Sequence, residues 1–360
     1  MLTLEAAGAG LTFDETIGNI PYLWFGKLHP LHKAPWYGEV EELQGLPPVE
    51  RRLAGDFFCM PFGKSDLISD PQHGYTANGE WALIDRTDAD ERHQMRFELQ
   101  VPVMGARIKK ELRLIDGNPV LYQRHDIIGG MGKVTLAHHP MVHMADGGRL
   151  TFSPKRAAVT PDKPPVDGRH VLAYPARSTK LSAFPGAKKT ANLHRYSERV
   201  GNEDFITLIE AEGSKIGWTA LVRKAERDIL FFMKESAVLP VTMLWYSNGG
   251  REFAPWSGRH TGVLGIEDGI AAGAAGHLAA IGANAVSAEG VSTCLTLEPK
   301  TKHVIRHAMG AVRAPSGFEE VASLELIEDR LILTSTDDAE IVVAFDPDFF
   351  RSAMPLGSGS

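Results

Sequence analysis

The sequence predicts an all-β protein whose strands are antiparallel. Short runs rich in β-branched and aromatic residues recur over roughly 300 residues, with turn residues between them. The amphipathic helices that connect the strands of a parallel sheet are missing between these runs. The 36 glycines and 22 prolines are typical of a chain with many turns.

Individual strands are predicted where such a run has the length and residue types of a strand. These runs are 96–101, 108–114, 120–128, 205–211, 216–222, 229–233, 241–246, 324–327, 331–334 and 341–345. Asp116-Gly117-Asn118 predicts a hairpin turn between the second and third runs, and Glu328-Asp329-Arg330 predicts another near the end of the chain. Residues 271–281 contain helix-forming alanines, but their glycines favour a loop or a short helix.

The chain is predicted to form a single domain over residues 1–356. Residues 160–187, rich in Pro, Lys and Gly, interrupt the strand pattern. A domain linker would have this composition, but strands of similar character resume after it. We therefore favour a surface insertion within one domain, which would suit a lid over a site. Gly357-Ser358-Gly359-Ser360 resembles a tail left by cloning.

The composition argues against several classes of partner. The 43% hydrophobic and 23% charged residues are those of a soluble globular protein, and the net charge is −7. The basic residues form no stripe, so neither nucleic acid nor a membrane is expected as a partner. Residues 269–285 are too weakly hydrophobic for a membrane span, and residues 1–5 begin no signal peptide, so a cytoplasmic location is expected. The protein is expected to be a monomer or a homodimer.

Residues 245–268 are the most informative segment. A tryptophan-rich polar loop, which includes Trp256, comes directly before an apolar run that carries Glu267. A glutamate in this position is expected at the rim of a β-structure, partly removed from water. Such a setting raises the pKa of a carboxyl group and makes it a usable base near neutral pH.

His138, His139 and His143 form the densest group of potential metal ligands. On a helix, His139 and His143 would share a face, but Pro140 and the β-like flanking residues disfavour a helix here. Metal ligation is therefore the less favoured interpretation. The alternatives are that His139 acts as a general acid or base at a strand end, or that it is a solvated loop histidine.

Two further segments offer groups that can bind a sugar. His73 lies in a turn-like segment before Tyr75 and Trp81, where it would either hydrogen-bond a sugar hydroxyl or cap the local backbone. Asp56 and Arg52 precede the apolar run 57–63. Asp56 would either accept hydrogen bonds from hydroxyl groups or form a structural salt bridge.

Common cofactor and nucleophile motifs are missing from the sequence. There is no phosphate-binding loop, Gly8-Ala9-Gly10 lacks the third glycine of a dinucleotide fingerprint, and no zinc-protease or serine-hydrolase motif occurs. No cofactor and no catalytic metal are therefore expected.

Four of these segments, taken in order, resemble motifs of the aldose 1-epimerase (galactose mutarotase-like) family, and most closely those of its hexose-6-phosphate mutarotase branch. The segments are 57–63, 71–81, His139-Pro140 and 264–267. That branch carries Phe-Pro-x-Phe-Gly, then His-Gly-Phe-Ala-Arg with a nearby Trp, then His-Pro, and late in the chain a Val-Glu-Pro-like motif. The likeness in motif order spans residues 50–310, and each motif is short.

The resemblance implies a fold and an activity. The fold would be a large antiparallel β-supersandwich, and the activity the interconversion of the α and β anomers of an aldose. His139 would be the acid that protonates the ring oxygen, Glu267 the base that removes the anomeric hydroxyl proton, and His73 a hydrogen-bond partner of the sugar. Asp56, Asn78, Trp256 and Arg52 are the further expected contacts of the sugar.

The sequence departs from the family pattern at three places. Ala77, followed by Asn78, replaces the arginine of the His-Gly motif, Asp268 replaces the proline after the glutamate, and Arg52 matches an upstream arginine only loosely. Without these arginines an unphosphorylated or otherwise modified sugar is favoured. Two alternatives stay open: a lyase or hydrolase, with Asp56 or Asp268 as its second carboxylate, and a sugar-binding protein without catalysis.

Overall fold

The computed structural model describes residues 1–39, 43–144, 146–196 and 200–350. The predicted tail at 357–360 lies outside these residues. Strands account for 48% of the chain and helices for 6%, so the all-β prediction is confirmed. The named strand pairs are all antiparallel.

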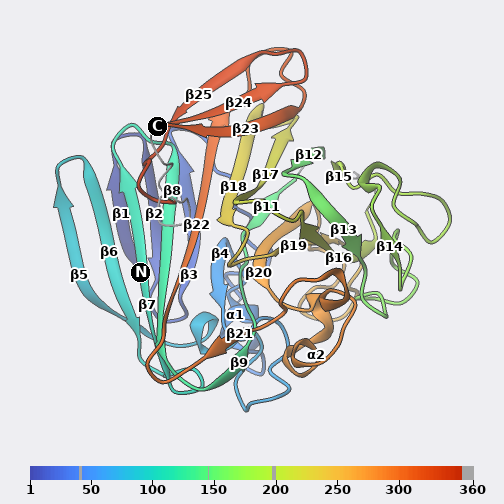
Figure 1. The fold of residues 1–360 in the computed structure, drawn as a ribbon, viewed down its shortest axis with the longest axis horizontal. Coiled ribbons are helices and arrows are strands. Elements are labelled where there is room, and N and C mark those ends of the chain that lie inside the picture. The colour runs from blue at the N-terminus through green and yellow to red at the C-terminus, as the bar shows by residue number, and fades with distance from the viewer. Residues whose placement is uncertain (40–42, 145, 197–199, 351–360) are drawn as a thin grey trace.

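Two large sheets dominate the described part of the chain (Figure 1). The first, sheet A, has eleven strands, in the order β1 (Leu2–Ala6), β2 (Ala9–Asp14), β3 (Asn19–Phe25), β4 (Asp56–Cys59), β10 (Leu136–His138), β20 (Val263–Ile270), β19 (Val241–Asn248), β16 (Asn202–Glu210), β13 (Lys155–Val159) and β14 (Arg177–Ser178), with β11 (Met141–His143) also paired to β20. The second, sheet B, has nine, in the order β15 (Arg195–Tyr196), β12 (Gly148–Phe152), β17 (Ile216–Arg223), β18 (Asp228–Glu235), β22 (Lys302–Arg313), β8 (Val120–Gly129), β7 (Ala106–Ile115), β6 (Arg92–Leu99) and β5 (Trp81–Ala89).

Smaller elements complete the described fold. They are the three-stranded sheet β23 (Val321–Ile327), β24 (Arg330–Ser335) and β25 (Glu340–Ala344), the pair β9 (Gly132–Val134) and β21 (Leu295–Leu297), and the short helices α1 (Pro48–Arg51) and α2 (His277–Ile281). In Figure 1 the three-stranded sheet, drawn in red, lies near the ends of β17 and β18. Every predicted strand overlaps an observed one, and both predicted hairpins are present, β7 with β8 and β23 with β24.

Three hydrophobic clusters show how the sheets are layered. One fills the space between the sheets, with Leu244 and Ile266 from sheet A and Leu112 and Leu230 from sheet B. A second covers the other face of sheet A, and the third lies between sheet B and the three-stranded sheet. Successive side chains of a strand point to opposite faces, so each residue of sheet A faces either the core between the sheets or the outer face.

The expected insertion at 160–187 follows β13. It is largely irregular, apart from β14 and one turn of 3₁₀ helix at Leu181–Ala183. Within the described residues, no helix combines the length and the apolar character that crossing a membrane requires.

Candidate active site

A cavity of about 690 Å³ opens on the outer face of sheet A. Its walls combine aromatic rings with a small number of polar groups, which is the usual make-up of a small-molecule site. The aromatic and polar residues that line it are Phe57, Phe62, Phe205, Trp245, Trp256, Glu50, Lys64, Gln72, His73, His139, Asp162, Lys163, Arg251 and Glu267.

His139 and Glu267 meet at the base of this cavity. The imidazole Nε2 of His139 lies 3.1 Å from Oε1 of Glu267. Both side chains are almost completely buried, with 6% and 1% of their surface exposed. The two side chains are therefore within direct hydrogen-bond distance and form an acid–base pair.

The alternation of the strands explains this meeting. In β20, Leu264 and Ile266 face the core between the sheets, so Glu267 faces the outer side. His139 lies just beyond β10, and Pro140 separates this strand from β11. Glu267 was expected at a rim, but β20 is an interior strand of sheet A and the residue is completely enclosed.

Burial shifts the pKa values of the pair in opposite directions. The loss of water raises the pKa of Glu267 well above its usual range, although the Arg251 charge opposes this. Burial lowers the pKa of His139 to about 4, and Asp56 opposes it while Arg251 adds to it. Both shifts favour the uncharged form of the pair, in which Glu267 holds the proton and His139 is neutral.

Aromatic rings fix the imidazole of His139. Phe57 is stacked on it with a centroid distance of 4.4 Å and an interplanar angle of 21°. The rings of His73 and Trp245 approach it edge-on at 5.2 Å and 5.7 Å. A ring held on three sides has little freedom to rotate, which keeps Nε2 directed at Glu267.

His73 lines the cavity in a left-handed backbone conformation with φ of 65°. Its Nδ1 accepts a hydrogen bond of 3.3 Å from the backbone N–H of Gly63. Burial lowers its pKa well below the usual range, and the charges of His139 and Arg251 act in the same direction. A neutral imidazole among the residues that line the cavity suits hydrogen bonding to a hydroxyl group.

Arg251 provides a fixed cation beside the pair. Its Nε donates to Oε1 of Glu203 at 2.9 Å, and its guanidinium lies 4.2 Å from the ring centroid of Trp256. Burial lowers the pKa of Arg251, but the neighbouring carboxylates Glu203, Glu50 and Glu267 oppose this. The sequence segment 245–268 contains Arg251 in its tryptophan-rich loop, so its position among the tryptophans was the available signal, which our sequence reasoning missed.

Three predicted sugar contacts do not line the cavity. Asp56 faces the core between the sheets, because it precedes Phe57 in β4, and it accepts a 2.6 Å hydrogen bond from Gln123. Asn78 accepts from the backbone N–H of Val49 and donates to two backbone carbonyls, so it ties loops together. Arg52 forms a salt bridge of 2.7 Å with Asp14. From the sequence, a structural salt bridge was considered for Asp56 instead. These three side chains therefore do not line the cavity that holds His73, His139 and Glu267.

The three histidines of the potential metal cluster point in different directions. His138 faces the core between the sheets and is stacked on His307 at 4.3 Å. His143 instead is stacked on His32 at 5.7 Å, away from His139. In the described ranges, no three His, Cys, Asp or Glu side chains come together as a metal-binding group.

One wall of the cavity comes from the insertion. Residues 161–165 (Pro-Asp-Lys-Pro-Pro) line it, as do Ala274, Ala275 and Ala279 of a later segment. The insertion thus narrows the cavity, as a lid would. The sequence predicted a site near it but gave no signal for which of its residues would contribute.

Comparison with known proteins supports the architecture. No family model matches the sequence, and no curated protein matches it. Solved structures do match. A galactose mutarotase related enzyme from Lactobacillus acidophilus has a TM-score of 0.56 and 12% identity, over 88% of this chain and 98% of its own.

Two further structures give the same result. A candidate aldose 1-epimerase from Escherichia coli K12 has a TM-score of 0.57 and 12% identity, over 86% of this chain and 98% of its own. A galactose mutarotase-like protein from Clostridium acetobutylicum has a TM-score of 0.56 and 9% identity, over 86% of this chain and 94% of its own. At these identities the likeness establishes a shared fold, the galactose mutarotase-like β-sandwich.

Proposed function

We propose that this protein interconverts the α and β anomers of a reducing sugar, with His139 and Glu267 as its acid–base pair. The observation that carries the proposal is the contact of 3.1 Å between these two side chains inside a cavity walled by aromatic rings. The shared fold with proteins named as mutarotases and epimerases supports it.

The reaction needs one proton donor and one proton acceptor. One group takes the proton from the anomeric hydroxyl O1 while the other protonates the ring oxygen O5. The C1–O5 bond then breaks with its electron pair on O5, and C1 and O1 form the aldehyde. Rotation about C1–C2 and the reverse steps give the other anomer, so no atom is gained or lost. A positioned acid or base contributes roughly 10²–10⁴-fold to such a step.

The resting pair already holds the single proton that the cycle requires. Glu267 and His139 contact each other, so the sugar must replace this bond with two of its own, from O5 to one side chain and from O1 to the other. The anomeric oxygen and the ring oxygen are both bonded to C1, so a small separation of the two side chains would admit them. As the sugar binds, the proton of the Glu267 carboxyl passes across the 3.1 Å contact to Nε2 of His139, and His139 then serves as the acid and Glu267 as the base.

The surrounding groups suit a sugar. Trp256 and Trp245 offer flat apolar faces to its C–H groups, and His73 and Arg251 offer polar groups to its hydroxyls. Ala77 is buried in a 3₁₀ turn and Arg52 is paired with Asp14, so neither position places an arginine in the cavity. Arg251, the arginine that does line the cavity, is paired with Glu203. We therefore propose an aldose without a phosphate group.

The lyase or hydrolase alternative loses its proposed second carboxylate. Asp56 and Asp268 both face the core between the sheets, away from the cavity. A binding protein without catalysis stays open to experiment, because it would use the same aromatic walls.

Anomer exchange tests the proposal directly. Freshly dissolved α-anomers of a panel of aldoses would be followed by polarimetry, and exchange at equilibrium by saturation-transfer NMR. We expect the protein to accelerate equilibration of at least one unphosphorylated aldose. Binding of a sugar without any acceleration, over the whole panel, would favour the binding-protein alternative.

A further inference from the structure

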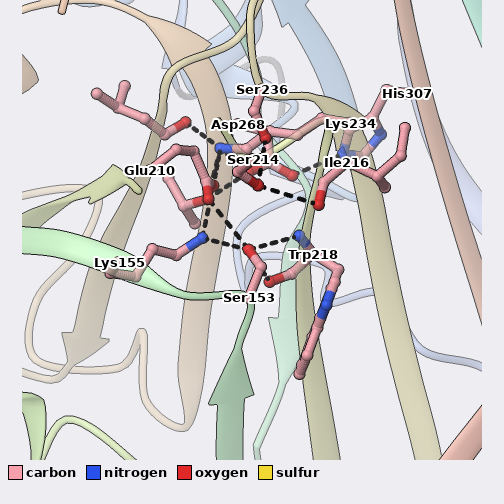
Figure 2. Close-up of polar contacts among 12 residues, drawn as sticks. Ser153, Lys155, Glu210, Ser214, Ile216, Trp218, Lys234, Ser236, Asp268 and His307 are labelled. Carbon is pink, nitrogen blue, oxygen red and sulfur yellow. Dashed lines mark hydrogen bonds and ion pairs between the residues drawn. The ribbon is translucent and has the colours of Figure 1, made fainter. Parts of the chain in front are cut away.

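A line of buried charged and polar side chains runs between the two large sheets, directly behind the His139–Glu267 pair. Figure 2 shows its central part, in which Lys155, Glu210, Lys234, Asp268 and His307 are joined by ion pairs and hydrogen bonds. Burying so many ionisable groups is costly unless each one is paired. None of these five side chains lines the cavity, so the proposed chemistry does not use them directly.

Asp268 connects this line to Glu267. The two residues are neighbours in β20 and point to opposite faces of sheet A. Oδ2 of Asp268 lies 3.0 Å from Nε2 of His307 in β22, and Oδ1 lies 2.8 Å from Nζ of Lys234 in β18. Both of these partners belong to sheet B. Thr242, the neighbour of Asp268 across β19, also donates to Oδ1 at 2.6 Å.

Asp56 makes the corresponding connection to His139. Its Oδ1 accepts the backbone N–H of His139 at 3.1 Å, and its Oδ2 accepts the side-chain amide of Gln123 in β8 at 2.6 Å. Gln123 also belongs to sheet B. The two connections belong to one polar layer, because His138, which lies 4.0 Å from Asp56, is stacked on His307.

We propose that Asp56 and Asp268 are positioning residues, which anchor the backbone beside His139 and beside Glu267 to sheet B and so fix the distance within the pair. The proposal rests on the proposed function, since it assigns these residues a role in that reaction. It accounts for two carboxylates that are buried away from the cavity yet lie beside both members of the pair.

The positioning matters because proton transfer tolerates only small displacements of the catalytic groups. A displacement of about 1 Å in a catalytic group costs on the order of 10²-fold in rate. His139 lies outside the hydrogen-bonded ladder of β10, so its amide depends on Asp56 and on the carbonyl of Phe57 for its position. Loss of the Asp56 carboxylate would leave Phe57 as the main support.

The test removes both hydrogen bonds of Asp56 and then restores them. Asp56→Ala removes the two oxygens that hold the His139 amide and the Gln123 side chain. We expect kcat to fall roughly 10- to 100-fold, with KM changed less than about twofold. Asp56→Asn keeps one oxygen for the His139 amide and can pair with the Gln123 amide once that amide rotates, so we expect it to retain most of the wild-type kcat. Retention of full kcat in Asp56→Ala, or a kcat in Asp56→Asn as low as that in Asp56→Ala, would overturn the proposal.

A matched control separates positioning from stability. Asp14 is also a buried aspartate, and neither it nor its partner Arg52 lines the cavity, so Asp14→Ala should lower the melting temperature without lowering kcat. A fall in kcat for Asp14→Ala equal to that for Asp56→Ala would show that lost stability alone explains the effect, and would also overturn the proposal.

A second measurement does not depend on turnover. The backbone N–H of His139 donates to Oδ1 of Asp56 at 3.1 Å, so hydrogen exchange of this amide, followed by NMR, reports the anchor. Asp56→Ala should speed the exchange of this amide, and Asp14→Ala should leave it unchanged. If the wild-type protein exchanged no anomers, the proposed function would fail while faster amide exchange still supported the anchoring; an unchanged exchange rate in Asp56→Ala would overturn the anchoring itself.

Discussion

Nε2 of His139 and Oε1 of Glu267 lie 3.1 Å apart, although His139 directly follows β10 and Glu267 lies in β20, at distant points of the chain. β10 and β20 are neighbours in sheet A, with Leu136 paired to Ile270. The pairing of β10 with β20 therefore brings the side chains of His139 and Glu267 together. A shift of one residue in either strand would turn one of the two side chains to the opposite face of the sheet.

Replacing Glu267 with glutamine should abolish most catalysis and preserve the fold. The amide has the size and the neutral charge of the protonated carboxyl that burial favours, but it accepts no proton at its nitrogen. We expect Glu267→Gln to bind sugar and to lose on the order of 10²-fold or more in kcat. Binding by isothermal titration calorimetry and exchange by saturation-transfer NMR would check both halves. Near-normal turnover would mean that Glu267 is structural.

Replacing His139 with asparagine should have a similar effect, because the ring oxygen then lacks its acid. The double variant Glu267→Gln, His139→Asn should be little slower than either single variant, since two groups that serve one proton transfer act as a unit. The three rates measured at one pH form a double-mutant cycle. Losses that multiply in the double variant would show that the residues act independently.

The pH dependence of the rate should show a broad plateau. The pair is active with one proton, so activity falls when a second proton binds or the single proton leaves. Burial lowers the pKa of His139 to about 4, which sets the acid limb, and raises that of Glu267 well above the usual carboxyl range, which sets the alkaline limb. The two limbs belong to the coupled pair. A profile of kcat against pH would check this, and an acid limb near the ordinary histidine value of 6.5 would contradict it.

Truncating Trp256 should weaken sugar binding more than it slows the chemistry. Its ring faces the cavity and lies under the guanidinium of Arg251 at 4.2 Å, so it contributes stacking area and orients the cation. An aromatic contact of this kind is worth about 0.5–1.5 kcal/mol, which corresponds to a rise in KM of roughly 2- to 10-fold for Trp256→Ala. Trp218, on β17 of sheet B, provides a matched control. An unchanged KM would exclude Trp256 from the sugar contacts.

Much of the fold was predictable because its information is local. The strand runs and the hairpin at Asp116-Gly117-Asn118 depend on residues close together in the sequence, and each was found where it was predicted. The resemblance in motif order added the supersandwich architecture, and it also selected His73, His139 and Glu267, which the structure brings to one cavity.

The face of the sheet toward which each side chain points was harder to predict from the sequence. Asp56 precedes an apolar run and was expected at its rim, but the alternation of β4 turns it toward Gln123 instead. Asp268 likewise follows Glu267 and faces the opposite way, toward Lys234. Arg251 was missed although it lies in a tryptophan-rich segment, because its contact with Trp256 forms only when the loop folds. These facts depend on strand pairing between distant segments, which local patterns do not encode.

His125 is buried between the sheets, the proposed reaction does not use it, and it should make the stability of the protein depend on pH. Its ring is stacked on Phe58 at 3.9 Å, and neither of its nitrogens has a hydrogen-bond partner in the described part of the structure. Burial lowers the pKa of His125 well below 6.5, and the charges of His138, Lys110 and His307 act in the same direction. Below pH 6.5 the unfolded chain binds a proton at His125 that the folded protein does not bind, so this residue lowers the free energy of unfolding as the pH falls.

His125→Leu removes the group and fills the same apolar space. The stability of the variant relative to the wild type should therefore rise by about 1.4 kcal/mol for each pH unit below 6.5. Urea unfolding of both proteins at pH 7, 6 and 5 would measure this difference, and a difference that does not change with pH would show that His125 binds its proton equally in both states.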